Sequence, residues 1–88
     1  MNARLTRTRL GEDLERDVHV VPQAGPAKSS AWSGEFWTPI ADRFQPGEEI
    51  FLTFADKRSG YATVQRVEID SRIVTNCRVE FNGNSPLA

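Results

Sequence analysis

Two side chains in this sequence could together perform nucleophilic chemistry: its single histidine, His19, and its single cysteine, Cys77. A thiol becomes a good nucleophile when a nearby imidazole takes its proton, and a Ser-His-Asp triad would need the same histidine. His19 lies in the β-branched run 18–21, and Cys77 lies between Thr75 and Val79 in an alternating apolar run. A cysteine on an apolar strand face behaves as a small hydrophobic side chain. We therefore expect structural roles for both residues and no catalytic residue.

Paired carboxylates, which serve general acid–base catalysis, occur at Glu48-Glu49 and at Glu68 and Asp70. Such catalysis needs one carboxyl group with a raised pKa in a cleft, whereas these acids stand at a strand start and at a hairpin end, where water solvates them. The glycines never form a phosphate-binding GxxxxGK or GxGxxG loop. One cysteine and one histidine are too few for a soft-ligand metal site. The sequence therefore predicts no enzyme, no cofactor and no metal.

Aromatic side chains provide a better candidate for function, because Trp32, Phe36 and Trp37 fall close together. Phe36 and Trp37 point to opposite faces of a strand, so both cannot enter one core. Exposed tryptophan is enriched at protein interfaces. We expect Phe36 to point inward and Trp37 to lie on a contact surface with Trp32 nearby. The candidate partner-binding residues are Trp32, Phe36, Trp37 and Tyr61.

Basic side chains offer a second function, nucleic-acid binding. Three arginines precede the first acidic residue and could form a basic arm, and further cations lie in a loop and on an outward strand face. These six residues are Arg4, Arg7, Arg9, Lys57, Arg58 and Arg66. Acidic residues interleave with the later cations, and eleven Lys and Arg stand against twelve Asp and Glu, for a net charge of -1. This balance argues against a polycationic binder, so nucleic-acid binding stays the alternative function.

The elements that must position these residues show a period of two in the second half of the chain. This alternation predicts strands over residues 35–39, 48–55, 60–69 and 73–81. In the last hairpin we expect Ile69 opposite Ile73 and Tyr61 opposite Phe81. Short strands joined by tight turns predict a mainly β fold, a small antiparallel SH3-like barrel or rolled sheet of four to five strands with a flexible N-terminal segment. The expected core is Ile50, Leu52, Phe54, Val67, Ile69, Ile73, Val79 and Phe81.

The first half of the chain has a weaker pattern. Leu5, Leu10 and Leu14 give a sparse helical stripe interrupted by Gly11, which favours a frayed tail or one short helix over residues 4–17. Residues 18–21 read as an edge strand that ends at proline, and residues 22–30 have a linker composition. We therefore predict a partly disordered arm and linker over residues 1–33 and a barrel domain over residues 34–88.

The second half also resembles known small barrels. The segments Phe44–Ile50, Gly60–Val64 and Arg78–Pro86 are similar to SH3-like and Tudor-like domains, and to short uncharacterised bacterial proteins with a related strand–Gly–small–Pro ending. The resemblance covers about residues 44–87 and implies the fold rather than a function. PilZ domains have a comparable second half. Their Asp-x-Ser-x-x-Gly motif has no match after residues 4–9, so we do not carry over their cyclic dinucleotide ligand.

Composition completes the prediction. The chain has 88 residues, of which 39% are hydrophobic and 26% charged, as in a single small soluble domain. No apolar run approaches the roughly 20 residues of a membrane span, and the unpaired Cys77 fits a reducing compartment. We expect a cytoplasmic, non-catalytic interaction module that binds a protein partner or forms a homo-oligomer.

Overall fold

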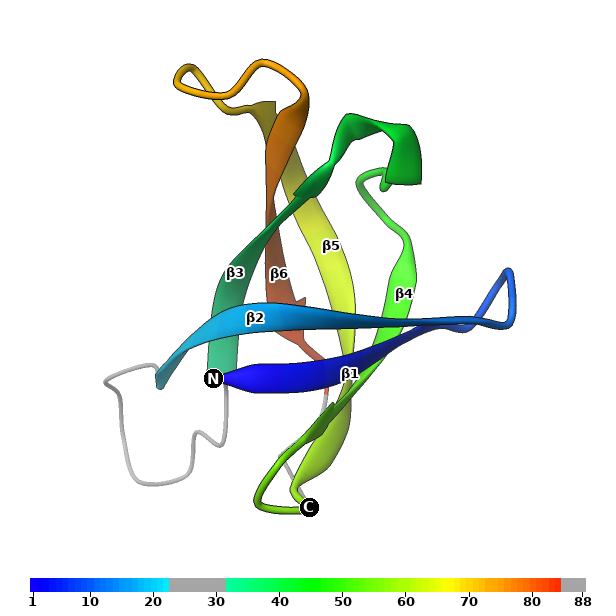
Figure 1. Cartoon of the computed structure of the whole chain (residues 1–88). Coiled ribbons are helices and arrows are strands. Elements are labelled where there is room, and N and C mark those ends of the chain that lie inside the picture. Colours follow the sequence, from blue (N-terminus) through cyan, green and yellow to red (C-terminus); the bar gives the residue numbers. More distant parts are fainter. Residues whose placement is uncertain (23–31, 85–88) are drawn as a thin grey trace.

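A computed structural model describes residues 1–22 and 32–84 as a closed antiparallel β-barrel (Figure 1). The strands follow the barrel in the order β1-β2-β3-β6-β5-β4. Their bounds are β1 Asn2–Arg7, β2 Glu12–Pro22, β3 Trp32–Pro39, β4 Glu49–Phe54, β5 Ser59–Ile69 and β6 Asn76–Gly83, with the short 3-10 helix η1 at Ile40–Asp42. The predicted mainly β, small antiparallel barrel is confirmed, with six strands instead of four to five.

The N-terminal residues belong to the barrel, so the expected tail or helix over residues 4–17, and a barrel that starts at residue 34, are wrong. Leu5 and Leu14, taken as parts of one helical stripe, lie directly opposite each other on β1 and β2. Gly11 has a φ of 66° in the turn between these strands, a conformation that glycine adopts at little cost. The expected linker, residues 22–30, lies outside the described residues from residue 23 onward.

The core fills the barrel with inward side chains from all six strands, because alternate residues of each strand point to one face. Of the expected core, Ile50, Leu52, Phe54, Val79 and Phe81 are buried, and Val67 packs against them while partly buried. The expected core positions of Ile69 and Ile73 are wrong, since these side chains are 68% and 52% exposed.

The register of the β5–β6 hairpin explains this error. Ile69 pairs with Cys77 instead of Ile73, because residues 70–75 form a longer connection than the expected three-residue turn. A β-bulge between Val64 and Arg66 also shifts the alternation. On β5, the residues before the bulge that point inward are Gly60, Ala62 and Val64. Phe81 therefore pairs with Val64, and the expected pairing of Phe81 with Tyr61 is wrong.

Candidate functional site

One end of the barrel is organised around a buried arginine. Arg7 is 4% exposed and occupies the third inward position of β1, after Ala3 and Leu5. Its Nε and Nη2 donate to the two carboxylate oxygens of Glu48 at 2.6 and 2.8 Å, and its guanidinium carbon lies 4.1 Å from the ring centroid of Phe44. The hydrogen bonds to Glu48 raise the pKa of Arg7 above its usual value. Arg7 is therefore a permanent cation that closes the barrel end.

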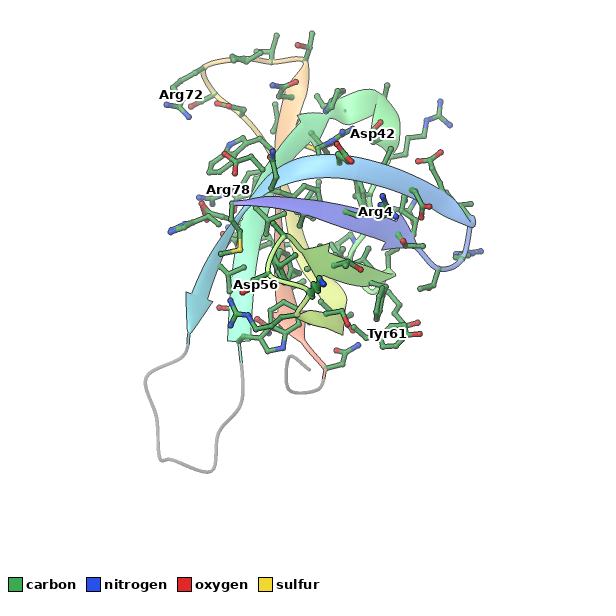
Figure 2. All side chains as sticks on the ribbon, turned by 60° about the horizontal axis from the view of Figure 1, so that its bottom comes forward. Arg4, Asp42, Asp56, Tyr61, Arg72 and Arg78 are labelled. Atoms are coloured by element: carbon green, nitrogen blue, oxygen red, sulfur yellow. The ribbon has the colours of Figure 1, made fainter. Side chains whose placement is uncertain are left out.

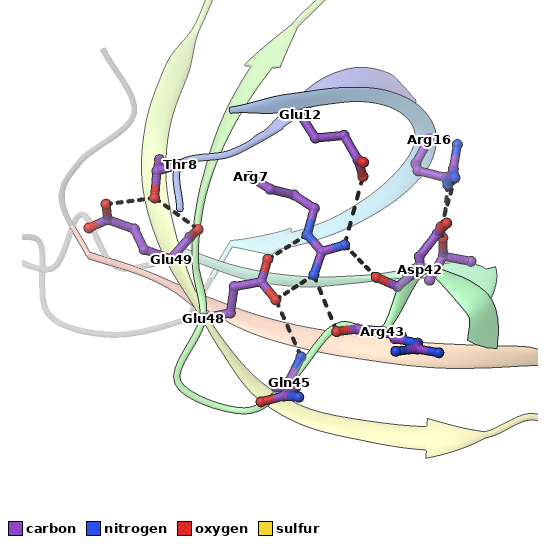
Figure 3. Close-up of polar contacts among 10 residues, drawn as sticks. Arg7, Thr8, Glu12, Arg16, Asp42, Arg43, Gln45, Glu48 and Glu49 are labelled. Carbon is purple, nitrogen blue, oxygen red and sulfur yellow. Dashed lines mark hydrogen bonds and ion pairs between the residues drawn. The ribbon is translucent and has the colours of Figure 1, made fainter. Parts of the chain in front are cut away.

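Further hydrogen bonds tie the β1–β2 hairpin to η1 (Figure 3). Arg7 donates to the carbonyl oxygens of Asp42 and Arg43. Arg16 of β2 donates to Thr38 Oγ1 at 3.0 Å and to Asp42 Oδ2 at 2.9 Å, and Thr38 donates to the same carboxylate. Burial opposes the ionisation of Asp42, but the bonds from Thr38 and Arg16 outweigh it and lower the pKa of Asp42. The cluster is a structural clamp made of satisfied charges.

A cleft of about 890 Å³ lies above this clamp. The β1–β2 turn with Arg9 and Leu10 forms one wall, and Arg43 with the turn at residues 45–47 forms the other. The charged groups on its floor are engaged with each other, as the Arg7–Glu48 pair shows. Arg7 therefore binds the carboxylate of Glu48 at the base of the cleft, and Arg16 binds that of Asp42.

A second surface gathers exposed apolar side chains at the end of the barrel that carries η1 and the β5–β6 connection (Figure 1). We call it the apolar end surface and define it by five residues with their exposed fractions: Trp37 38%, Ile40 40%, Ile69 68%, Ile73 52% and Val74 71%. Ile69 links two hollows, one shared with Trp37 and Arg78 and one of about 270 Å³ shared with Ile40 and Cys77. Ile69 therefore lies between Trp37 of β3 and Ile40 of η1, and Ile73 and Val74 follow on the β5–β6 connection.

Of the five residues of the apolar end surface, only Trp37 was predicted from the sequence to lie on a contact surface. Ile69 and Ile73 were assigned to the core and Val74 was passed over. The signal that could have found them is the position of Ile73-Val74 directly after the polar residues 70–72, where a turn is more typical than the start of a strand.

The other predicted partner-binding residues are not brought together. Trp32 is buried, not on a surface beside Trp37, and its ring lies 5.7 Å from that of Phe81 in an edge-on contact. Phe36 is fully buried, as expected for its inward orientation, so neither ring is available to a partner. Tyr61 is 45% exposed but packs against Phe51 on the outer face of β4 and β5, away from the side where Arg78 lies (Figure 2).

The six candidate nucleic-acid contacts are also dispersed. Arg7 is buried against Glu48 and cannot reach a phosphate, so the expected basic arm is wrong at that residue. Arg58 pairs with Asp56 at 2.6 Å, and Arg66 pairs with Glu68. Arg4 lies on the outer face of β1, Arg9 in the β1–β2 turn and Lys57 in the β4–β5 turn. The residues lie on separate parts of the barrel and form no single basic stripe.

The candidate nucleophilic pair is separated by the barrel wall. Cys77 is buried on the inner face, where desolvation first and Asp42 second raise the pKa of its thiol. His19 is exposed, and β2, which carries it, does not pair with β6. Within residues 1–22 and 32–84, no group of three His, Cys, Asp or Glu side chains could hold a metal ion.

The chain matches no protein family, no curated protein and no solved structure. The part of the chain that the structure describes contains no helix long and apolar enough to cross a membrane.

Proposed function

We propose that this chain is a non-catalytic interaction module that binds a protein partner, or a second copy of itself, through the apolar end surface. One observation carries the proposal: of the eight exposed large hydrophobic side chains of the described residues, five come from the end of β3, η1, the end of β5 and the β5–β6 connection. Scattered exposed apolar residues are ordinary, but a contiguous apolar patch with a polar rim marks an interaction site.

The rim of the surface supports a protein partner. Arg78 pairs with Glu68 at 3.3 Å, and Arg72 pairs with Asp70 at 3.5 Å, so both signs of charge are present beside Trp37. Protein interfaces place such polar groups around an apolar centre, with aromatic residues enriched in it. A phosphate backbone would instead favour cations without neighbouring acids.

Photo-cross-linking tests the proposal in the cells that make the protein. Benzoylphenylalanine at Ile73 should give a cross-linked protein adduct upon irradiation, and the same group at Tyr61, 45% exposed on the outer face of β5, should give none. Adding Ile69→Glu should abolish the adduct from position 73, because a charge then lies at the centre of the apolar contact. Absence of an adduct from position 73, or an equal yield from both positions, contradicts the proposed function.

A further inference from the structure

The β2 strand leaves half of one edge without a neighbouring strand. Its pairing with β1 runs from Glu12 to Asp17, and its pairing with β3 runs only from Val18 to Pro22. Beyond the Val18–Phe36 pair, β3 continues to Pro39 but pairs with β6 alone, and η1 follows at Ile40. Residues 12–17 of β2 therefore pair with β1 alone among the described strands.

The alternation of hydrogen-bonded and non-hydrogen-bonded pairs between β1 and β2 shows which backbone groups of β2 face this open edge. Val18 N donates to Met1 O at 2.8 Å and Met1 N donates to Val18 O at 3.0 Å, so these residues form a hydrogen-bonded pair. Such pairs alternate along an antiparallel ladder, so Arg16 and Leu14 also bond to β1. The backbone N–H and C=O groups of Asp13, Glu15 and Asp17 consequently point away from β1.

A side chain lies partly across this edge. Arg16 Nη1 donates to Glu15 O at 2.7 Å, while the same guanidinium holds Thr38 and Asp42. Both groups of Asp13 and the N–H of Glu15 remain directed at the open side. The edge begins at the 890 Å³ cleft beside Glu12 and ends at a hollow of about 470 Å³ that Asp17 shares with Trp37. Six residues of strand span about 20 Å.

We propose that this edge accepts an extended basic segment of a partner protein as an added β-strand. The side chains of Asp13, Glu15 and Asp17 are exposed on the outer face of β2. Asp13 accepts a hydrogen bond from Thr6 at 2.7 Å, and Asp17 pairs with the N-terminal ammonium at 2.9 Å while its side chain stays 83% exposed. Exposed edge strands are templates for strand addition, and directly opposite side chains favour opposite charges. A segment with Lys or Arg at every second position therefore complements the edge. This inference uses β2 and does not rest on the proposed function.

A displayed library of random octapeptides, selected on the full chain, tests this inference. Enriched peptides should carry Lys or Arg at alternate positions. Glu15→Pro removes the one N–H that faces the open edge at that residue and leaves the ladder to β1 intact, since proline is tolerated on strand edges. It should weaken binding of an enriched peptide at least tenfold. Glu15→Thr keeps the N–H, so it should weaken binding less, and Tyr61→Ala, on the outer face of β4 and β5, should leave it unchanged.

N-methylation of the peptide provides the same test on the wild-type protein, should Glu15→Pro fail to fold. Methyl groups on the amides that face β2 should abolish binding, and methyl groups on the alternate amides should not. The inference is overturned if no peptide is enriched, or if the enriched peptides lack basic residues at alternate positions. It is also overturned if neither Glu15→Pro nor N-methylation of the amides that face β2 changes the affinity. The acidic edge then serves only to discourage strand association.

Discussion

The guanidinium of Arg7 binds both carboxylate oxygens of Glu48, although the two residues are 41 positions apart and their side chains are only 5% and 10% exposed. The pair joins β1 to the segment just before β4, and so fixes the strand that sequence reasoning treated as a tail. Its geometry matches the planar fork of arginine to a carboxylate.

Arg7→Met should lower the free energy of unfolding by about 3–5 kcal/mol, because it leaves Glu48 as a nearly buried charge without its partner. Arg7→Lys should also destabilise, since an ammonium group cannot reproduce the bidentate contact. Urea unfolding monitored by circular dichroism measures both losses. Arg4→Met, on the exposed face of the same strand, is the control and should change stability little. Equal effects at positions 4 and 7 would show that the buried pair contributes nothing.

Asp42 should make the fold sensitive to acid. Its pKa in the folded state lies below the unfolded value of about 3.9, so its ionised form adds stability at neutral pH. That contribution is lost as the pH falls from about 4 through the folded pKa. Asp42→Asn should therefore be less stable than the wild type at pH 7, and the difference should shrink at pH 3. A difference in unfolding midpoint that is the same at both pH values contradicts the role of Asp42.

Gly34 marks a close approach between β3 and its neighbours. A Cβ atom at this position would lie 2.6 Å from His19 O and 2.6 Å from Phe81 Cζ. Gly34→Ala should cost about 1–3 kcal/mol, because the backbone of β2 must shift to relieve the overlap. Thermal unfolding compared with Ser33→Ala measures the effect. A Gly34→Ala protein as stable as this control would show that β2 and β3 are farther apart.

The two tryptophans should respond differently to truncation. Trp32 lies in the core against Phe54 and Phe81, so Trp32→Ala should cost about 3–5 kcal/mol. Trp37 is 38% exposed, so Trp37→Ala should cost much less. Denaturant midpoints of the two variants decide this. A loss at position 37 as large as that at position 32 would place Trp37 in the core and remove it from the apolar end surface.

The sequence was sufficient to predict the barrel class and the part of the core that β4 and β6 contribute, because the inward residues of these two strands alternate without interruption. It was insufficient for β1, where Arg7 takes an inward position that only a partner 41 residues away can satisfy. It was also insufficient after Val64, because a bulge changes the inward face within one strand. Ile69 and Ile73 were misassigned for a different reason: both look like core residues unless the β5–β6 connection is known to extend over residues 70–75.

A partner that contacts the apolar end surface should lose affinity when the exposed ring of Trp37 is removed. The partner is the protein cross-linked from position 73, or the chain itself if the adduct is a dimer. Trp37→Ala should weaken this association by about 2 kcal/mol or more, roughly 30-fold, as expected for a tryptophan hot spot. Tyr61→Ala, which removes an exposed ring elsewhere on the barrel, should leave the affinity within a few-fold of the wild type. Unchanged affinity in Trp37→Ala would contradict the account.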